Sequence, residues 1–301
     1  MGSNGNAGKT VVVTGANGGI GLATALELAG KGFDVIGTVR SESAAKKVTE
    51  ATGNAGVKVR TVQLDVTDNE QTARAWAEIE SLTGGGPWAL VNNAGIAQAG
   101  AIEDVDDEAA RRQIDVNVHG PAKLMRLALP AMRERGDGRI VNVSSMSGRV
   151  SLPFLGWYAA SKFALEAVSD AARREVAGFG VKVILIEPGS YGTGVWQTAF
   201  SALPDREKSA YREAYGMVDQ IEESVSDMPA PTPVAKTIQR ALSASYPRSR
   251  YLVGADAIGA VLLNAVTPTP VVDYAMRLGM GLTRAPKPLE RVVDRVVQRL
   301  M

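Results

Sequence analysis

The feature that most constrains the fold is a strand–turn–helix–strand unit near the start of the chain. Thr10–Thr14 is a short β-branched run, typical of a buried parallel strand. The glycine-rich turn Gly15–Gly21 follows, and a helical pattern then continues to Lys31. The run Asp34–Arg40 completes the unit as a second strand. This order presents backbone N–H groups and a helix N-terminus to a phosphate, although a glycine turn after a strand can also be purely structural.

The same alternation continues along the chain. Further strands are predicted at Lys58–Leu64, Trp88–Val91, Arg139–Val143, Lys182–Glu187 and Tyr251–Val253, and helices at Asn69–Leu82, Asp106–Glu134 and Trp157–Ala177. Alternating strands and helices predict an α/β fold of the Rossmann type, a doubly wound parallel sheet of about seven strands with helices on both faces.

No Pro/Ser-rich linker divides the chain, so residues 1–301 are predicted to form a single domain. Within it, residues 1–8 are expected to be a flexible leader and 255–301 a C-terminal extension. Residues 190–232 follow the sixth predicted strand and are rich in aromatic side chains. They are predicted to form a lid over a substrate, and a small satellite core is the alternative.

Composition excludes several classes of function. Lys and Arg number 33 against 32 Asp and Glu, so nothing in the charge favours a nucleic-acid partner. The absence of cysteine excludes disulfides, thiol catalysis and Cys-bound zinc. With His119 as the only histidine, no metal site and no Ser-His-Asp triad are expected. No apolar run reaches the roughly 18 residues of a spanning helix, and no signal peptide is evident, so we expect a cytoplasmic protein.

Three residues of the segment Val141–Lys162 form a candidate proton-transfer site. Tyr158 and Lys162 are four residues apart, so on a helix they share one face. Ser145 follows a predicted strand, at the edge where open α/β sheets place ligands. An ammonium beside a phenol is expected to lower the phenol pKa from about 10, while a nearby hydroxyl holds a substrate oxygen. Tyr-x-x-x-Lys is also frequent on ordinary helices. The choice between a catalytic and an ordinary role for this pair therefore depends on the other motifs.

The end of the second predicted strand bears on the choice of cofactor. Dinucleotide folds place an acid there for the adenosine 2′-hydroxyl, or an arginine for a 2′-phosphate. Here the strand ends in Thr38-Val39-Arg40 without an acid. A carboxylate would repel a phosphate, whereas a guanidinium can bind it through two N–H groups. Arg40 therefore favours NADP(H) over NAD(H), and a solvated arginine entering a loop is the alternative.

Polar and small residues mark three further places. Asp65 could accept a hydrogen bond from an adenine amino group or could begin a turn, and Asn92–Gly95 would allow close backbone approach to a ligand or form a plain turn. Within the long helix, Pro121 lacks an N–H, so the carbonyl of Asn117 loses its donor. If that carbonyl faces the cleft it can hold a water molecule; an ordinary kink is the alternative.

The last segment, Leu289–Met301, carries an apolar stripe at helical spacing. Packing on the domain or on a second subunit is preferred to membrane contact. The reason is that Glu290 and Asp294 dilute the basic face that binding to a lipid surface requires.

Together these motifs resemble those of the short-chain dehydrogenase/reductase superfamily in its single-domain form, in unbroken order over about Lys9–Thr193. The turn Thr14–Gly21 matches the family pattern TGxxxGxG, and Asn92–Gly95 matches NNAG. Tyr158 follows Ser145 at the spacing that the family prefers. The other matches are Lys162 of Tyr-x-x-x-Lys, Asn117 of the catalytic tetrad, Asp65-Val66 at the adenine, and Pro188-Gly189 with Thr193 at the nicotinamide carboxamide.

The resemblance implies roles for these residues. Tyr158 would be the general acid in reduction and the base in oxidation, and Ser145 would bond the substrate oxygen. Lys162 would lower the pKa of the tyrosine and hold the nicotinamide ribose, and Asn117 would hold a water through its main-chain carbonyl. The implied cofactor contacts are Gly15, Asn17, Gly19, Ile20, Gly21, Arg40, Asp65, Val66, Asn92, Ala94, Gly95, Tyr158, Lys162, Pro188, Gly189 and Thr193.

The expected function is NADP(H)-dependent interconversion of a ketone or aldehyde and an alcohol. The sequence looks like hydroxysteroid or retinol-type dehydrogenases and bacterial ketoreductases, and a homodimer or homotetramer is expected by analogy. A bulky, apolar small-molecule substrate is suggested by residues expected near the cleft, namely Met146, Phe154, Leu155, Trp157 and Trp196. One alternative is a non-catalytic dinucleotide-binding sensor or scaffold on the same fold. Another is epimerisation or dehydration by the same groups.

Overall fold

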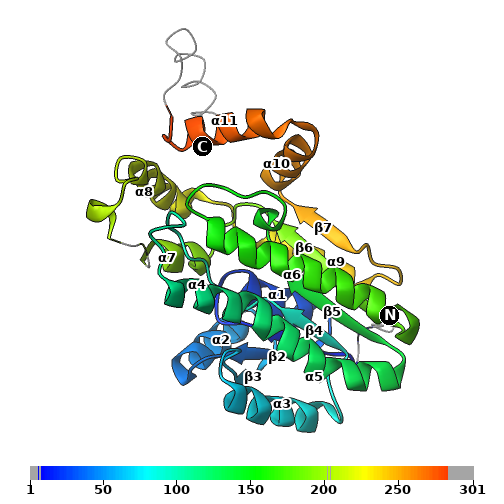
Figure 1. Ribbon diagram of the computed structural model, residues 1–301. Coiled ribbons are helices and arrows are strands. Elements are labelled where there is room, and N and C mark those ends of the chain that lie inside the picture. The colour runs from blue at the N-terminus through cyan, green and yellow to red at the C-terminus, as the bar shows by residue number, and fades with distance from the viewer. Residues whose placement is uncertain (1–5, 7, 202, 204, 284–301) are drawn as a thin grey trace.

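The computed structural model describes residues 6, 8–201, 203 and 205–283, and its centre is a seven-stranded parallel sheet (Figure 1). The strands lie in the order β3-β2-β1-β4-β5-β6-β7. Their bounds are β1 Thr10–Thr14, β2 Asp34–Val39, β3 Arg60–Gln63, β4 Ala89–Asn92, β5 Gly138–Val143, β6 Val181–Pro188 and β7 Arg250–Val253. All seven predicted strands are therefore confirmed, with ends that shift by no more than a few residues.

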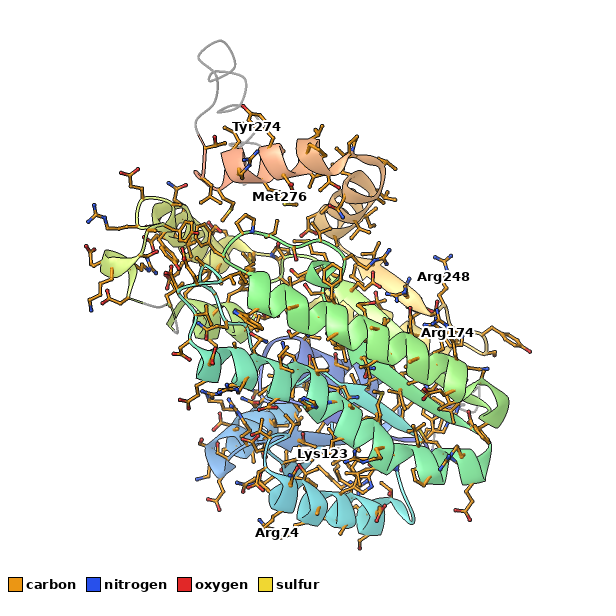
Figure 2. The ribbon with its side chains drawn as sticks, viewed as in Figure 1. Arg74, Lys123, Arg174, Arg248, Tyr274 and Met276 are labelled. Atoms are coloured by element: carbon orange, nitrogen blue, oxygen red, sulfur yellow. The ribbon has the colours of Figure 1, made fainter. Side chains whose placement is uncertain are left out.

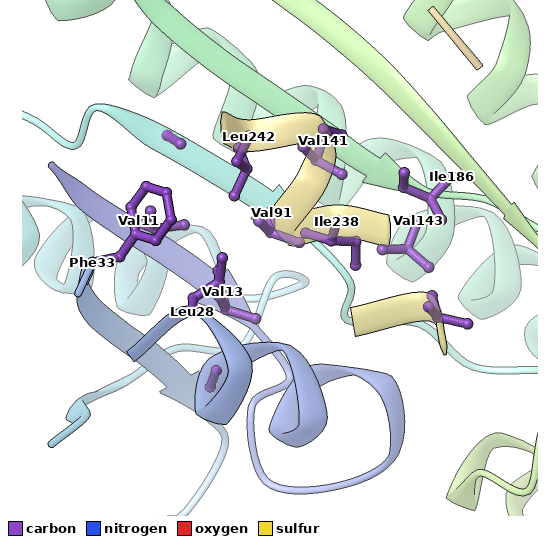
Figure 3. Close-up of a cluster of buried hydrophobic side chains, with 14 of the residues drawn as sticks. Val11, Val13, Leu28, Phe33, Val91, Val141, Val143, Ile186, Ile238 and Leu242 are labelled. Carbon is purple, nitrogen blue, oxygen red and sulfur yellow. The ribbon is translucent and has the colours of Figure 1, made fainter. Parts of the chain in front are cut away.

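Alternation along each strand divides the apolar side chains between two cores. Val11 and Val13 of β1 join the core beneath α1 (Gly19–Gly30) and α9 (Thr232–Ser243), while Val12 faces the opposite side. Figure 3 shows Leu28 of α1, with Ile238 and Leu242 of α9, gathered on the first face. The helix α2 (Glu42–Asn54) covers the same face beside β2. Burying each such Val, Leu or Ile side chain stabilises the fold by about 1.5–3 kcal/mol.

The second face is covered by three long helices, α3 (Asn69–Thr83), α5 (Gly120–Arg135) and α6 (Gly156–Glu175). Their buried residues include Trp76, Ile79, Leu124 and Met132, which pack on the strands. The predicted doubly wound architecture is confirmed, because helices lie on both faces of the parallel sheet. Since β2 and β4 flank β1 on opposite sides, the crevice above the carboxyl end of β1 is the place where such a fold puts its ligand.

The predicted interruption near Pro121 is a change of helix type. The helix α4 (Asp107–Ile114) widens into a π turn at Asp115–His119, and α5 then begins at Gly120. The Gly120 N–H donates to the carbonyl of Asp115, five residues back. Pro121 cannot donate to Asn117, so the usual four-residue pattern cannot pass through this point. The π turn places Asn117, which is 1% exposed, inside the protein.

The segment between β6 and α9 contains α7 (Gly194–Ser201) and α8 (Tyr215–Ser224). Its side chains form the satellite core that the sequence left as one alternative. Phe200, Tyr215 and Val218 are buried there together with Phe154 and Ala101 from other loops. The role of residues 190–232 as a substrate lid stays a prediction.

Two helices follow β7, namely α10 (Ala255–Val266) and α11 (Thr269–Gly279), and Figure 2 shows Tyr274 and Met276 on α11 at the outer end of the molecule. Among the residues that the structure describes, no helix is long and apolar enough to cross a bilayer. The predicted helix Leu289–Met301 lies outside the described residues, as does most of the predicted leader 1–8.

Candidate active site

The three candidate proton-transfer residues come from one strand–loop–helix passage. After β5, Ser145 begins a short 3-10 turn at Met146–Gly148 by accepting the Ser147 N–H on its Oγ at 3.1 Å. The chain then enters α6, which carries Tyr158 and Lys162 one turn apart. The Ser145 hydroxyl lies beside the Tyr158 phenol and lowers its pKa as a hydrogen-bond partner. The structure thus brings the three predicted residues together at the carboxyl end of β5.

Burial dominates the electrostatics of this group. It raises the pKa of Tyr158, and the hydrogen bond with Ser145 opposes that rise. It also lowers the pKa of Lys162 to about 8. The lysine Nζ donates to the Val143 carbonyl at 2.9 Å and lies 5.7 Å from the centroid of the Tyr158 ring. The expected lowering of the tyrosine pKa is not found here: burial of the phenol raises this pKa, and the opposing cause is Ser145 rather than Lys162.

A cleft of about 370 Å³ runs from the glycine turn to this group. It is lined by predicted cofactor contacts from the whole length of the sheet edge, namely Gly15, Asn17, Gly19, Ile20, Arg40, Asp65, Val66, Ala94, Gly95, Tyr158, Lys162 and Thr193. These residues are spread over the chain from Gly15 to Thr193. Their convergence on one cleft is what a dinucleotide site at a topological switch point requires.

The glycine turn leaves no room for a side chain at Gly21, in the first turn of α1. A Cβ added to Gly21 would lie 2.1 Å from the Gly15 carbonyl oxygen and 2.5 Å from Asn93 Nδ2. Gly15 itself has a φ of +65°, a conformation that favours glycine. No side chain caps the N-terminus of α1, and its first turn holds no acidic residue. Backbone N–H groups and the positive end of the helix dipole are therefore free for an anion.

Thr14 and Asn93 fix the two sides of the switch point, and sequence reasoning gave neither a role of its own. The Thr14 Oγ1 accepts the backbone N–H groups of Asn93 and Ala94 at 2.9 and 2.8 Å. In return, Asn93 Nδ2 donates to the Thr14 carbonyl at 2.8 Å. These bonds hold the loop after β4 against the end of β1.

Three charged residues meet at the other end of the cleft. Asp65 accepts the backbone N–H and the hydroxyl of Thr67 at 2.9 and 2.7 Å. Burial raises the pKa of Asp65, but the bonds from Thr67, with the charges of Arg40 and Arg112, lower it below its ordinary value. Arg112 of α4 also lines the cleft. The sequence did not indicate this role for Arg112, because the residue lies on a solvent-exposed face of the helix. With two guanidinium groups and one carboxylate, this end of the cleft carries a net positive charge.

The amides of Asn117 and Gln113 hold the loop after β4 from the helix side. Asn117 accepts the Ile96 N–H at 3.0 Å and donates to the Ile96 carbonyl at 2.9 Å and to Ser161 Oγ at 3.0 Å. Gln113 accepts the Gln98 N–H at 2.7 Å. The Asn117 side chain is thus fully engaged within the protein. Its predicted water-holding role concerns the main-chain carbonyl and stays a prediction.

Four predicted cofactor contacts do not line the cleft, namely Gly21, Asn92, Pro188 and Gly189. Asn92 turns its amide into the sheet, where Nδ2 donates to Asn142 Oδ1 at 2.8 Å. Gly189 continues the pairing with the last strand by donating to the Val253 carbonyl at 2.9 Å. These residues support the walls of the cleft, and their contacts with a cofactor stay predictions.

Comparison with known proteins decides the family. The model of the short chain dehydrogenase family matches residues 9–203. The chain belongs to this family. This short-chain dehydrogenase is 37% identical to human retinol dehydrogenase 16 over 287 residues, which cover 89% of this chain and 87% of the relative. It is accordingly an oxidoreductase.

Two solved structures of short-chain dehydrogenases share the fold. One, from Burkholderia phymatum in complex with NAD, has a TM-score of 0.76 and 25% identity, and the match covers 86% of this chain and 94% of that one. The other, a metagenomic oxidoreductase in complex with NADP, has a TM-score of 0.66 and 26% identity, and the match covers 83% and 98%. The structural neighbours therefore include both a NAD and a NADP complex.

Proposed function

We propose that this short-chain dehydrogenase interconverts a ketone or aldehyde and an alcohol with NADP(H), acting on a bulky, apolar substrate. The observation that supports the proposal is a cleft that begins at the glycine turn and is lined at its other end by Tyr158 and Lys162, with Ser145 beside the phenol. A non-catalytic sensor or scaffold would need the glycine turn to bind a dinucleotide. It would not need a buried phenol beside a serine hydroxyl.

The residues present fit a nicotinamide dinucleotide. The free N-terminus of α1 suits its diphosphate, and Arg40 with Arg112 suits a 2′-phosphate at the far end. The cofactor would supply the hydride, and Lys162 is placed to hold its ribose hydroxyls. Both a NAD and a NADP complex occur among the neighbours, so the preference for NADP(H) rests on the two arginines.

The protein groups would handle the proton and the substrate oxygen. Tyr158 would donate its phenolic proton to the oxygen during reduction and take it back during oxidation, and Ser145 would hold that oxygen as charge develops on it. Because burial raises the pKa of Tyr158, the phenol is protonated at neutral pH and is poised to act as the acid. Lys162, whose pKa is lowered to about 8, can return a proton to the tyrosine.

The surroundings of the phenol favour an apolar substrate. Tyr158 is buried with the methyl groups of Ala97, Ala99 and Ala199, and Leu155 and Val195 pack against them. The name of the relative retinol dehydrogenase 16 likewise points to a long apolar alcohol. The expected cytoplasmic location and homo-oligomeric state stay predictions.

A spectrophotometric screen tests this function. NADPH and NADH oxidation would be followed at neutral pH with a panel of small and bulky ketones, and NADP⁺ reduction with the matching alcohols. We expect turnover with bulky apolar ketones and a preference for NADPH. Tight NADPH binding without turnover on any carbonyl or alcohol would instead favour the non-catalytic binder.

A further inference from the structure

The loop between β4 and α4, here the 96–104 loop, forms the wall nearest the phenol. Ala97 and Ala99 of this loop are almost fully buried against Tyr158. Because their methyl groups border the ring, the position of the loop sets the space beside the phenol where a substrate carbonyl must lie. What fixes this loop therefore bears on the proposed reaction.

The two ends of the 96–104 loop are held in different ways. At its start, the backbone N–H groups of Ile96 and Gln98 donate hydrogen bonds to the side-chain amides of Asn117 and Gln113. At its far end, the hydroxyl of Tyr215 in α8 accepts the Ala101 N–H at 2.9 Å and donates to the Asp104 carboxylate at 2.8 Å. The Ser209 hydroxyl donates to the same carboxylate at 2.7 Å. The segment 205–224 thus holds the far end of the loop through the hydroxyls of Tyr215 and Ser209.

The Tyr215 ring reaches a second element that leads to the active site. Its centroid lies 5.0 Å from that of Phe154, which is the one non-glycine residue with positive φ, +63°, in the described part of the chain. Such a conformation persists only where the surroundings fix it. The Phe154 carbonyl accepts the Gly100 N–H at 2.8 Å, and the next residue, Leu155, precedes α6 and packs near Tyr158.

We propose that Tyr215 is a positioning residue for the reaction proposed above, acting on Tyr158 through the 96–104 loop on one side and through Phe154 on the other. Tyr215 is 1% exposed and belongs to the satellite core, whereas Tyr158 lies in a separate cluster, so the action is indirect. The hydroxyl must accept one bond and donate another, which a phenylalanine cannot do. Burial and the neighbouring Asp104 carboxylate raise the pKa of Tyr215 to about 12, so it keeps its proton at working pH.

The first test is Tyr215→Phe in the full chain, which keeps the ring and removes both hydrogen bonds. We expect kcat for a bulky apolar ketone to fall about tenfold, because a displaced loop misplaces the substrate carbonyl. The KM for NADPH should be unchanged, since the cleft around the glycine turn is remote from α8. The matched control is Tyr251→Phe, which also removes one hydroxyl hydrogen bond, accepted from the Arg248 N–H at 3.0 Å, but in β7 and not at the 96–104 loop. It should behave like the wild type.

Asp104 gives an independent test should Tyr215→Phe fold poorly. Asp104→Ala should reproduce the loss of kcat, and Asp104→Asn should restore most of it because an amide oxygen still accepts the two hydroxyl bonds. Combining Tyr215→Phe with Asp104→Ala should cost less than the sum of the two separate losses, because the two changes remove one hydrogen bond in common.

A purely stabilising role would lower the melting temperature of Tyr215→Phe and leave the kcat of the folded enzyme unchanged at 25 °C. That result, or fully additive losses in the double variant, would overturn the inference while the proposed function stands. A wild-type enzyme that turns over no carbonyl or alcohol would remove the proposed function and, with it, the reaction that Tyr215 is said to serve.

Discussion

The two walls of the cleft are built on different principles. The wall at the glycine turn is made of backbone in such close contact that a Cβ on Gly21 would lie 2.1 Å from a carbonyl oxygen. The wall at the 96–104 loop is held by side chains, through the Tyr215 hydroxyl, the Asp104 carboxylate and stacked or tilted rings. The first wall depends on close contact between the glycine turn and the loop after β4, whereas the second depends on hydrogen bonds made by side chains. The first should therefore fail when a side chain is added at Gly21, and the second on the loss of a single polar group.

Two glycines test the contrast most strongly. Gly21→Ala should lower the free energy of unfolding by about 3 kcal/mol, because neither the Gly15 carbonyl nor the Asn93 amide can move without breaking the turn. Gly216→Ala, in α8, has nothing within 4 Å of the added Cβ and should raise the free energy of unfolding by less than about 1 kcal/mol. Urea unfolding of both variants checks this. Equal losses would mean that the walls do not differ in packing.

Arg40 contributes a charged side chain to the wall that is otherwise made of backbone. Arg40→Asp should reduce the ratio of kcat/KM for NADPH to that for NADH about a hundredfold, equivalent to about 2.7 kcal/mol, since a carboxylate there repels a 2′-phosphate. Arg74→Asp provides the same change of charge on the exposed face of α3, away from the cleft (Figure 2). It should leave the ratio unaltered. An unchanged ratio in Arg40→Asp would assign the phosphate to another residue.

Lys162 lies on α6 and lines the cleft. Its burial predicts that the free energy of unfolding depends on pH. Its pKa falls from the ordinary 10.5 to about 8 in the folded protein, so below pH 8 the fold must hold a buried ammonium. Between those values the folded protein releases a proton that the unfolded chain keeps, and the stability of the wild type rises with pH. Lys162→Met should therefore be more stable than the wild type by about 1–2 kcal/mol at pH 7.

That advantage should shrink as the pH rises from about 8 and should stop changing above 10.5, where lysine is neutral in both states. Chemical unfolding of wild type and variant at several pH values gives the difference directly, because other titrating groups cancel. A difference that does not depend on pH would show that Lys162 is not desolvated in the fold.

The strands and the first wall were predictable because their signals are local. Thr10–Thr14 with Gly15–Gly21 specifies a strand, a turn and a helix start within twelve residues, and the structure has all three. The same is true of the interruption at Pro121, whose missing N–H acts within one helical turn. The sequence did not reveal that the helix widens into a π turn at this point.

The second wall was not predictable for the opposite reason. Nothing in the residues around Tyr215 indicates that its hydroxyl meets Ala101 and Asp104, because that bond depends on where two distant loops settle. Arg112 and Gln113 were missed likewise, since a charged or amide residue on a helix has no local sign of a tertiary partner. The pKa of Tyr158 differs from the expectation because burial of the phenol, which sequence spacing does not report, raises it.

The central claim is that the Tyr158 phenol passes the proton in a redox step at the inner end of the cleft, and Tyr158→Phe tests it most directly. The variant should bind NADPH, followed by fluorescence, with a Kd within about twofold of the wild type, because the glycine turn and Arg40 are untouched. With the best ketone found for the wild type, its turnover should fall at least about a thousandfold. Unimpaired turnover in Tyr158→Phe, with cofactor bound, would contradict the account.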